Sequence, residues 1–565
     1  MFNKIPEHWL ARYANNYHAW QKYVLDGDEV YRRPLGLVEL GFHIDGESGG
    51  RSDMFALIKL EIRHSLSREE FRRRILLAWT SLRLQHVLLM SRIYENEELG
   101  RQEFAIDVPK SKEQILEETT KTLVWVDDHY SKVNGDNFLR HSLNVGRPIN
   151  PEECTGKVFV LPLEELPNGN MNLEFCVSMA HIISDGMAAF NWWAHLIQLL
   201  NKPVTDLERD IDTFRTPKSI WSKLPPAQED LYPVAGNKAR QRWFWAILRV
   251  IRHIRKPLPP TFTNPLVREN PLLEATSPPP TYSKVFDYSA ERKPMVNTYT
   301  YSFPLSAAGS KLVFNLSRSA GTSIGAGGFA LVAMAMMELD ETRRSSVPLV
   351  ERQPFSTSFP LNPRQHFGHT APPDNCMLQF CSGIILPFLP SNLPFEGRFK
   401  LLAKQAQRQM KIYQKRGKPS QGVANLEPGS PGRMLADGYL WKIENIQDKL
   451  HEKRKSDVNP QGQYPASASG IGPTCIISWL GSVEHLVGPG RGVLGDVNTH
   501  DFVAEYRDIK MGVKARINEF FVGSSTVGEI LGFQICHDGT GISEESAAMW
   551  EEKIKSLVER RQARM

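Results

Sequence analysis

The segment HIISDG at residues 181–186 combines residue types suited to proton transfer. Histidine is the side chain whose ordinary pKa lies near neutral pH, so a neutral imidazole can take a proton from a reacting hydroxyl. Asp185, four positions later, could orient the imidazole, as in a hydrolase triad. Gly186 gives backbone freedom and room where the chain turns tightly. We therefore predict that His181 is a general base.

The elements on either side place this histidine at the end of a strand. Residues 173–180 are apolar and predict a buried strand, and residues 187–200 space their apolar side chains as a helix does. A histidine at such a junction can face a cleft. The alternative is a hydrogen-bonded histidine with a purely structural role. For Trp192 and Trp193 we predict core packing.

Other constellations carry weaker signals. His366 and His369 stand near Asp374, but no further histidine follows at a ligand-like spacing, so we predict no metal site. Glycines at 325–328 lack the Lys-Ser/Thr of a phosphate loop and predict a close helix contact instead. A GxSxG nucleophile elbow is absent from the sequence.

Composition indicates a globular protein of more than one domain. The chain has 565 residues, of which 41% are hydrophobic and 23% charged. A net charge of +5 does not indicate nucleic-acid binding. The six cysteines lack CxxC spacing and are interpreted as buried thiols of a reducing compartment. With no signal-peptide core and no apolar run long enough to span a membrane, we expect a cytoplasmic protein.

Strand and helix patterns alternate along both halves, which predicts an α/β fold with an N-terminal domain at 1–205 and a C-terminal domain at 294–565. Between them, prolines cluster in a crossover at 206–293. The remaining predicted elements are strands at 54–64, 87–90, 298–303, 355–361, 381–386, 475–479 and 529–536, helices at about 68–82, 322–339, 396–416 and 543–560, and a loop at 455–470.

Residues 238–256 form a basic, amphipathic helical stretch inside the crossover. Such a helix could lie on a membrane surface. We favour a crossover helix that packs on the body of the protein, because apolar stripes usually face a core.

Taken together, these segments resemble the CoA-dependent acyltransferase superfamily that carries the HxxxDG motif. This superfamily includes chloramphenicol acetyltransferase, plant alcohol acyltransferases and condensation domains, and the chain looks most like its fungal trichothecene 15-O-acetyltransferase type. Supporting segments are residues 76–90, similar to the first helix and following strand, PLNPR at 360–364 and SWLG at 478–481.

The resemblance implies two chloramphenicol-acetyltransferase-like domains, mixed sheets flanked by helices, with an active-site channel at their interface. It implies that His181 acts without an acyl-enzyme, that Asp185 pairs with Arg364 to fix the loop, and that Ser478 or a neighbouring amide stabilises the oxyanion. Acyl-CoA, expected to be acetyl-CoA, is then a co-substrate rather than a bound cofactor. The acceptor is a hydrophobic alcohol such as a trichothecene-like sesquiterpenoid, and the enzyme is expected to be a monomer.

The sequence also departs from parts of that superfamily. Residues 495–502 do not match the DFGWG motif of the plant enzymes, and Ala180 stands where condensation domains usually carry a second histidine. The alternatives that remain open are an amide-forming or carrier-protein-dependent acyltransferase and a non-catalytic member of the fold.

Overall fold

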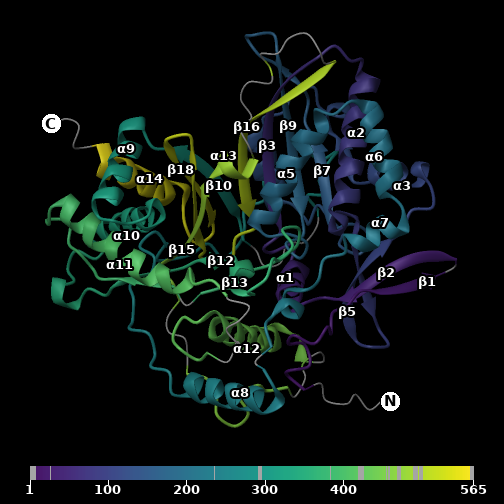
Figure 1. Ribbon diagram of the computed structural model, residues 1–565. Helices are drawn as coiled ribbons and strands as arrows, with labels where there is room; N and C mark the ends of the chain where they lie inside the picture. Colours follow the sequence, from purple (N-terminus) through teal and green to yellow (C-terminus); the bar gives the residue numbers. More distant parts are fainter. Residues whose placement is uncertain are drawn as a thin grey trace.

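The structure is a computed structural model that describes residues 8–25, 27–234, 236–289, 296–381, 383–417, 425–452, 455, 458–467, 472–487, 494 and 501–559. Its main feature is a pair of six-stranded sheets that lie side by side with helices packed against them (Figure 1). The predicted α/β class with mixed sheets flanked by helices is therefore confirmed.

The first six-stranded sheet has the order β16-β3-β9-β7-β6, with β8 paired to β9. Its strands are β3 (Met54–His64), β6 (Leu123–Trp125), β7 (Gly156–Val160), β8 (Glu164–Glu165), β9 (Met171–Met179) and β16 (Phe502–Val513). Buried residues run almost without a break through β9 because helices cover both faces of this sheet. The helices of this region are α2 (Arg68–Gln85), α3 (Lys112–Thr120), α4 (Gly135–Asn144), α5 (Gly186–Leu200) and α6 (Val204–Phe214).

One strand of this sheet comes from far along the chain. The whole length of β16 pairs antiparallel with β3, from Phe502 opposite His64 to Val513 opposite Met54. The sheet built on residues 1–205 thus includes a strand from within 294–565. The two halves of the chain therefore share this sheet. The domain boundaries at residues 205 and 294 stay predictions.

The second six-stranded sheet has the order β10-β18-β17-β15-β11-β14. Its strands are β10 (Thr298–Pro304), β11 (Phe355–Ser358), β14 (Ile384–Leu386), β15 (Cys475–Ser482), β17 (Phe520–Val527) and β18 (Ile530–Asp538). Helices α9 (Ala307–Ser319), α10 (Ile324–Arg343), α11 (Phe395–Tyr413) and α14 (Glu544–Glu559) pack beside it.

The glycines of α10 make the predicted close contact. A Cβ at Gly328 would lie 2.0 Å from Cζ3 of Trp479, and one at Gly327 would lie 2.1 Å from Oγ of Ser317. Only hydrogen fits at these two positions, so the helix can approach β15 and α9 closely.

The crossover carries α7 (Pro217–Ser222), the short 3₁₀ helix η3 (Gln228–Leu231) and α8 (Lys238–His253). Helix α8 lies below the two sheets beside α12 (Pro431–Lys449) (Figure 1). The remaining elements are β1 (Gln21–Leu25), β2 (Asp28–Pro34), α1 (Leu37–Glu47), η1 (Val87–Met90), β4 (Arg92–Asn96), β5 (Arg101–Asp107), η2 (Val126–Asp128), η4 (Leu349–Glu351), β12 (Pro360–Leu361), η5 (Pro363–His366), β13 (Gln379–Phe380) and α13 (Val483–Val487).

Several predicted elements need correction. Residues 87–90 form the 3₁₀ turn η1 rather than a strand, since Leu89 N–H donates to His86 O and Ser91 N–H to Leu88 O. A short apolar run has no periodicity that separates the two structures. The strand predicted at 355–361 divides into β11 and β12 of different sheets, and the one at 381–386 begins only at Ile384. Part of the loop predicted at 455–470 lies outside the described residues.

Other expectations agree with the structure. The helix predicted from about residue 68 is present as α2, and Ser67 and Glu70 exchange hydrogen bonds at its start. All six cysteines are free. Within the described part of the chain, no single helix is long and apolar enough to cross a membrane, and one pair, α9 with α10, passes that test together while bent by 113°.

Candidate active site

His181 sits in the short turn between β9 and α5, as predicted. Just after the strand, Ala180 N–H donates to Thr155 O at 2.9 Å. At the start of α5, the Asp185 carboxylate accepts a hydrogen bond from Ala188 N–H, also at 2.9 Å. This N-cap satisfies a backbone donor that the helix itself leaves free. These two hydrogen bonds fix the ends of the turn, residues 180 and 185, that carries His181.

The imidazole of His181 is packed against an aromatic ring. Phe42, on α1, lies parallel to it with ring centroids 3.8 Å apart and an interplanar angle of 4°. The Cys376 Sγ atom, from the other half of the chain, lies 4.0 Å from His181 Nδ1. Burial lowers the pKa of His181 to about 4, so the ring is neutral at physiological pH.

Asp185 points away from the imidazole and toward the C-terminal half. Its Oδ2 atom lies 2.8 Å from Nη1 of Arg364 and accepts a hydrogen bond from Met377 N–H at 2.9 Å. Among the residues that the structure describes, no hydrogen bond joins Asp185 to His181. The Asp185–Arg364 pair expected from the resemblance is present, and its place favours fixing the loop over orienting the ring.

Arg364 ties down the segment that faces His181. Its guanidinium also donates to Pro372 O at 2.9 Å and to Asn375 O at 2.7 Å. A single arginine thus connects Asp185 to the backbone just before Cys376.

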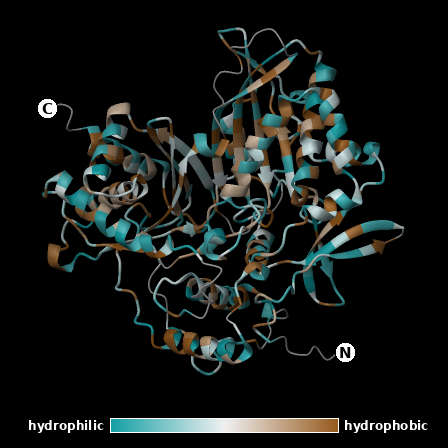
Figure 2. Ribbon diagram, viewed as in Figure 1, coloured by the Kyte–Doolittle hydropathy of each residue, from teal (hydrophilic) through white to brown (hydrophobic). Residues whose placement is uncertain are grey.

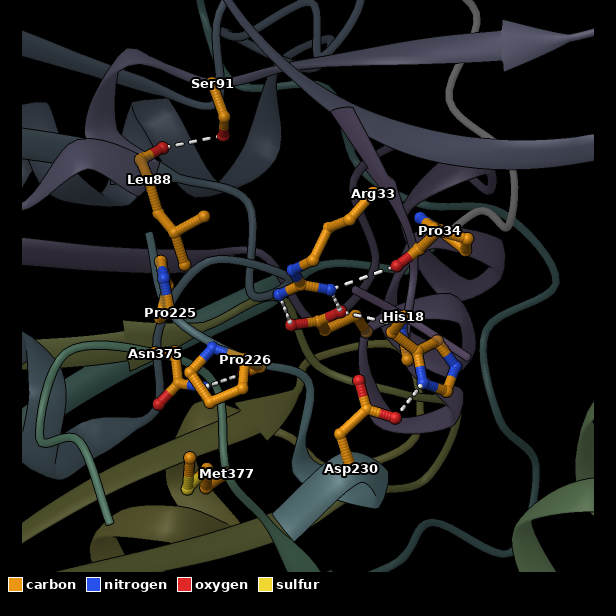
Figure 3. Close-up of polar contacts among 12 residues, drawn as sticks. His18, Arg33, Pro34, Leu88, Ser91, Pro225, Pro226, Asp230, Asn375 and Met377 are labelled. Atoms are coloured by element: carbon orange, nitrogen blue, oxygen red, sulfur yellow. Dashed lines mark hydrogen bonds and ion pairs between the residues drawn. The ribbon is translucent and has the colours of Figure 1, made fainter. Parts of the chain in front are cut away.

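The crossover also binds the segment around Cys376. Asn375 Nδ2 donates to Pro226 O at 2.8 Å, and Leu378 N–H donates to Oε1 of Gln228, also at 2.8 Å. Figure 3 shows Asn375 beside Pro226, with Arg33 and the hydrogen-bonded His18 and Asp230 close by. Arg33 forms a buried ion pair with Glu39. The site therefore forms where the N-terminal half, the crossover and the C-terminal half meet.

The other two predicted residues lie close to this junction. Gly186 is the first residue of α5, and a Cβ there would meet only Leu480 Cδ2 of β15, at 3.7 Å, an ordinary contact. Its φ is not positive, so the structure does not require glycine for conformational freedom there, contrary to our expectation. Ser478 is partly exposed in β15, two residues before Leu480.

A pair of histidines joins the end of α2, which His86 caps, to α5, which contains His195. His86 Nε2 and His195 Nδ1 share a hydrogen bond of 2.9 Å, and His86 Nδ1 lies 3.2 Å from an oxygen of Asp374. Burial, followed by the charge of His86, lowers the pKa of His195 to about 4. Asp374 is thus engaged with His86 rather than with His366, whose Nε2 bonds to Tyr413 O.

No three His, Cys, Asp or Glu side chains of the described residues are placed to hold a metal ion. Cys376 is fully buried, and burial raises the pKa of its thiol well above the usual value. Because the thiolate is the reactive form, this thiol is poorly suited to act as a nucleophile.

Sequence reasoning missed Phe42, Cys376 and the His86–His195 pair. Each makes its contact across more than a hundred residues of sequence. The only local signal was the apolar run around Phe42, which does not say what the ring packs against.

Comparison with known proteins bears on the fold. No family model matches the chain, and no curated protein matches it by sequence. Among solved structures, a trichothecene 15-O-acetyltransferase from Fusarium sporotrichioides is similar, with a TM-score of 0.65 and 10% identity over 96% of this chain and 97% of that chain. The condensation domain of the monacolin K polyketide synthase gives a TM-score of 0.51 and 11% identity, over 94% of this chain and 97% of that one. The first condensation domain of the calcium-dependent antibiotic synthetase gives 0.51 and 11%, over 93% and 95%. The chain therefore shares the fold of this acetyltransferase and of these condensation domains.

Proposed function

We propose that this protein is an O-acyltransferase that moves a short acyl group, acetyl in the first instance, from acyl-CoA to a hydroxyl of a hydrophobic secondary metabolite. One observation carries the proposal. A neutral imidazole, His181, is held at the meeting point of the two halves with no carboxylate bonded to it among the described residues and no activated nucleophile beside it. Such a group is suited to general-base catalysis.

The reaction then needs a single proton carrier. The alcohol oxygen attacks the thioester carbonyl carbon while His181 takes the hydroxyl proton. The tetrahedral intermediate collapses with cleavage of the C–S bond, and the imidazolium returns the proton to the departing thiolate of coenzyme A. Nδ1 faces the Cys376 thiol, so we assign proton transfer to Nε2.

The packing around the ring supports direct transfer. Phe42 fixes the plane of the imidazole, and Asp185 with Arg364 fixes the backbone that carries it. Positioning of this kind lowers a barrier because the reacting groups no longer lose freedom at the moment of reaction. We assign the oxyanion donor to Ser478 or a neighbouring amide of β15, a role that requires a donor where negative charge develops.

For the acceptor, we propose a sesquiterpenoid alcohol of the trichothecene type. The likeness in fold to a trichothecene 15-O-acetyltransferase, over 96% of this chain, supports this choice.

The test is incubation of the purified protein with a set of acyl-CoAs and a panel of sesquiterpenoid alcohols, followed by mass analysis for added acyl groups. His181→Ala should lower the rate about 100- to 10,000-fold. His369→Ala, an exposed histidine in the neighbouring loop, should leave the rate unchanged. Transfer only from a carrier-bound donor, or to an amine, would replace the proposal with a condensation-type reaction. A folded protein with no transfer from any donor would point to a non-catalytic member of the fold.

A further inference from the structure

Helix α8 has two apolar faces. On the inner face, Phe244, Trp245 and Leu248 are 2%, 5% and 1% exposed and share a core with Tyr439 and Leu440 of α12. This packing agrees with our preference for a crossover helix lying on the body of the protein. It does not account for the other face.

The outer face carries a second apolar stripe. Trp243, Ile247, Val250 and Ile254 follow one another at intervals of four, three and four residues, which places them along one side of the helix. Their side chains are 70%, 41%, 56% and 67% exposed. Figure 2 shows hydrophobic residues along α8 at the lower rim of the molecule, where Figure 1 places this helix below α12. An apolar stripe at such a rim is accessible to a flat surface.

The charged residues of the segment that carries the stripe all have one sign. Residues 231–268 contain no aspartate or glutamate. Arg252 is turned inward and pairs with Asp437 and Glu444 of α12. The basic residues of this stretch that remain exposed are Lys238, Arg240, Arg242 and Lys256. An exposed apolar stripe on a helix whose own exposed charges are all cations fits a surface that is apolar inside and anionic outside.

We propose that the outer face of α8, defined by Trp243, Ile247, Val250 and Ile254 with their basic neighbours, docks on an anionic membrane surface. A helix of this kind lies in the plane of the interface, with its apolar face among the acyl chains and its cations at the headgroups. A second copy of the chain would bring the same cations together, so self-association through this face is disfavoured. The proposal is independent of the reaction that His181 performs.

Vesicle flotation tests the proposal with the full chain. One set of vesicles is phosphatidylcholine alone, and the other contains about 30% phosphatidylserine, both at about 50 mM salt so that charges are weakly screened. The protein should float with the anionic vesicles and much less with the neutral ones. Absence of binding to anionic vesicles would overturn the proposal. It would do so even if the outer face of α8 bound an acidic protein instead.

Two variants separate the apolar and the charged contributions. Serine at all four stripe positions should weaken binding at least about tenfold, since each apolar side chain contributes through its buried area. The double change Arg240→Glu/Arg242→Glu should weaken binding to anionic vesicles by roughly fivefold or more for each cation lost. A matched control, Leu349→Ser/Val350→Ser, removes two apolar side chains that are 55% and 92% exposed on η4. Equal binding by the stripe variant and the control would contradict the proposal.

A second measurement does not depend on the variants folding. Hydrogen exchange in the wild-type protein should slow in residues 238–256 when anionic vesicles are added, and should not change at η4. Unchanged exchange in α8 under conditions where the protein floats would place the membrane contact elsewhere and overturn the assignment.

Discussion

His181 and His195 belong to the same strand–turn–helix unit, and burial lowers the pKa of both, yet different groups surround their rings. Burial lowers the pKa of each to about 4. His195 gives one ring nitrogen to His86, which in turn faces Asp374. His181 instead has a phenyl ring on its face and a protonated thiol near Nδ1. A lowered pKa alone therefore does not distinguish a base from a structural histidine; the groups around the ring and its place between the two halves do.

The carboxylates near the two histidines differ in how deeply they are buried. Asp185 is 2% exposed, and it caps α5 while pairing with Arg364. The side chain of Asp374 is 31% exposed beside His86. Both join the N-terminal half to the segment around residues 372–377, but only Asp185 does so from inside the protein. The loop that carries His181 depends on the buried link.

The largest expected effect separates the two histidines directly. His181→Ala should lower the rate of acyl transfer about 100- to 10,000-fold, because the proton acceptor is gone. His195→Gln should lower it less than about tenfold, since an amide can still bond to His86. Rates per folded molecule, measured with one acyl-CoA and one alcohol, check this. Equal losses in the two variants would remove the distinction between the sites.

Next in size is the contrast between the two carboxylates. Asp185→Ala should cost roughly 3 to 5 kcal/mol of unfolding free energy, because it leaves the positive charge of a mostly buried Arg364 without its carboxylate. Asp374→Ala should cost no more than about 1 kcal/mol, as expected for a partly exposed ion pair. Urea unfolding of both variants gives the two values. A larger loss at Asp374 would mean that the link through His86 holds the halves together.

A smaller effect is expected from the ring that stacks on His181. Phe42→Leu keeps most of the volume but removes the stack, so the rate should fall roughly two- to tenfold. Phe71→Leu is a matched control, because Phe71 of α2 also stacks on a histidine, His64 of β3, with ring centroids 5.1 Å apart. It should lower stability to a similar extent while leaving the rate per folded molecule unchanged. A rate loss in both variants would assign the effect to general destabilisation.

The local parts of this arrangement could be predicted from the sequence, and the long-range parts could not. The strand before His181 and the helix after it follow from periodicity, and the Asp185–Arg364 pair followed only from a resemblance. The pairing of β16 with β3 had no local signal, because an apolar strand does not say which sheet it joins. The contacts of Phe42 and Cys376 with His181 likewise depend on how distant segments pack.

The central claim is that His181 is a base kept neutral by burial, and the pH dependence of kcat/KM tests it most directly. A base works only when deprotonated. Since burial lowers its pKa from 6.5 to about 4, activity should stay level from pH 8 down to about 5 and fall only below that, with circular dichroism confirming that the protein remains folded. A fall centred near pH 6.5 in the folded protein would show a solvated histidine and contradict the account.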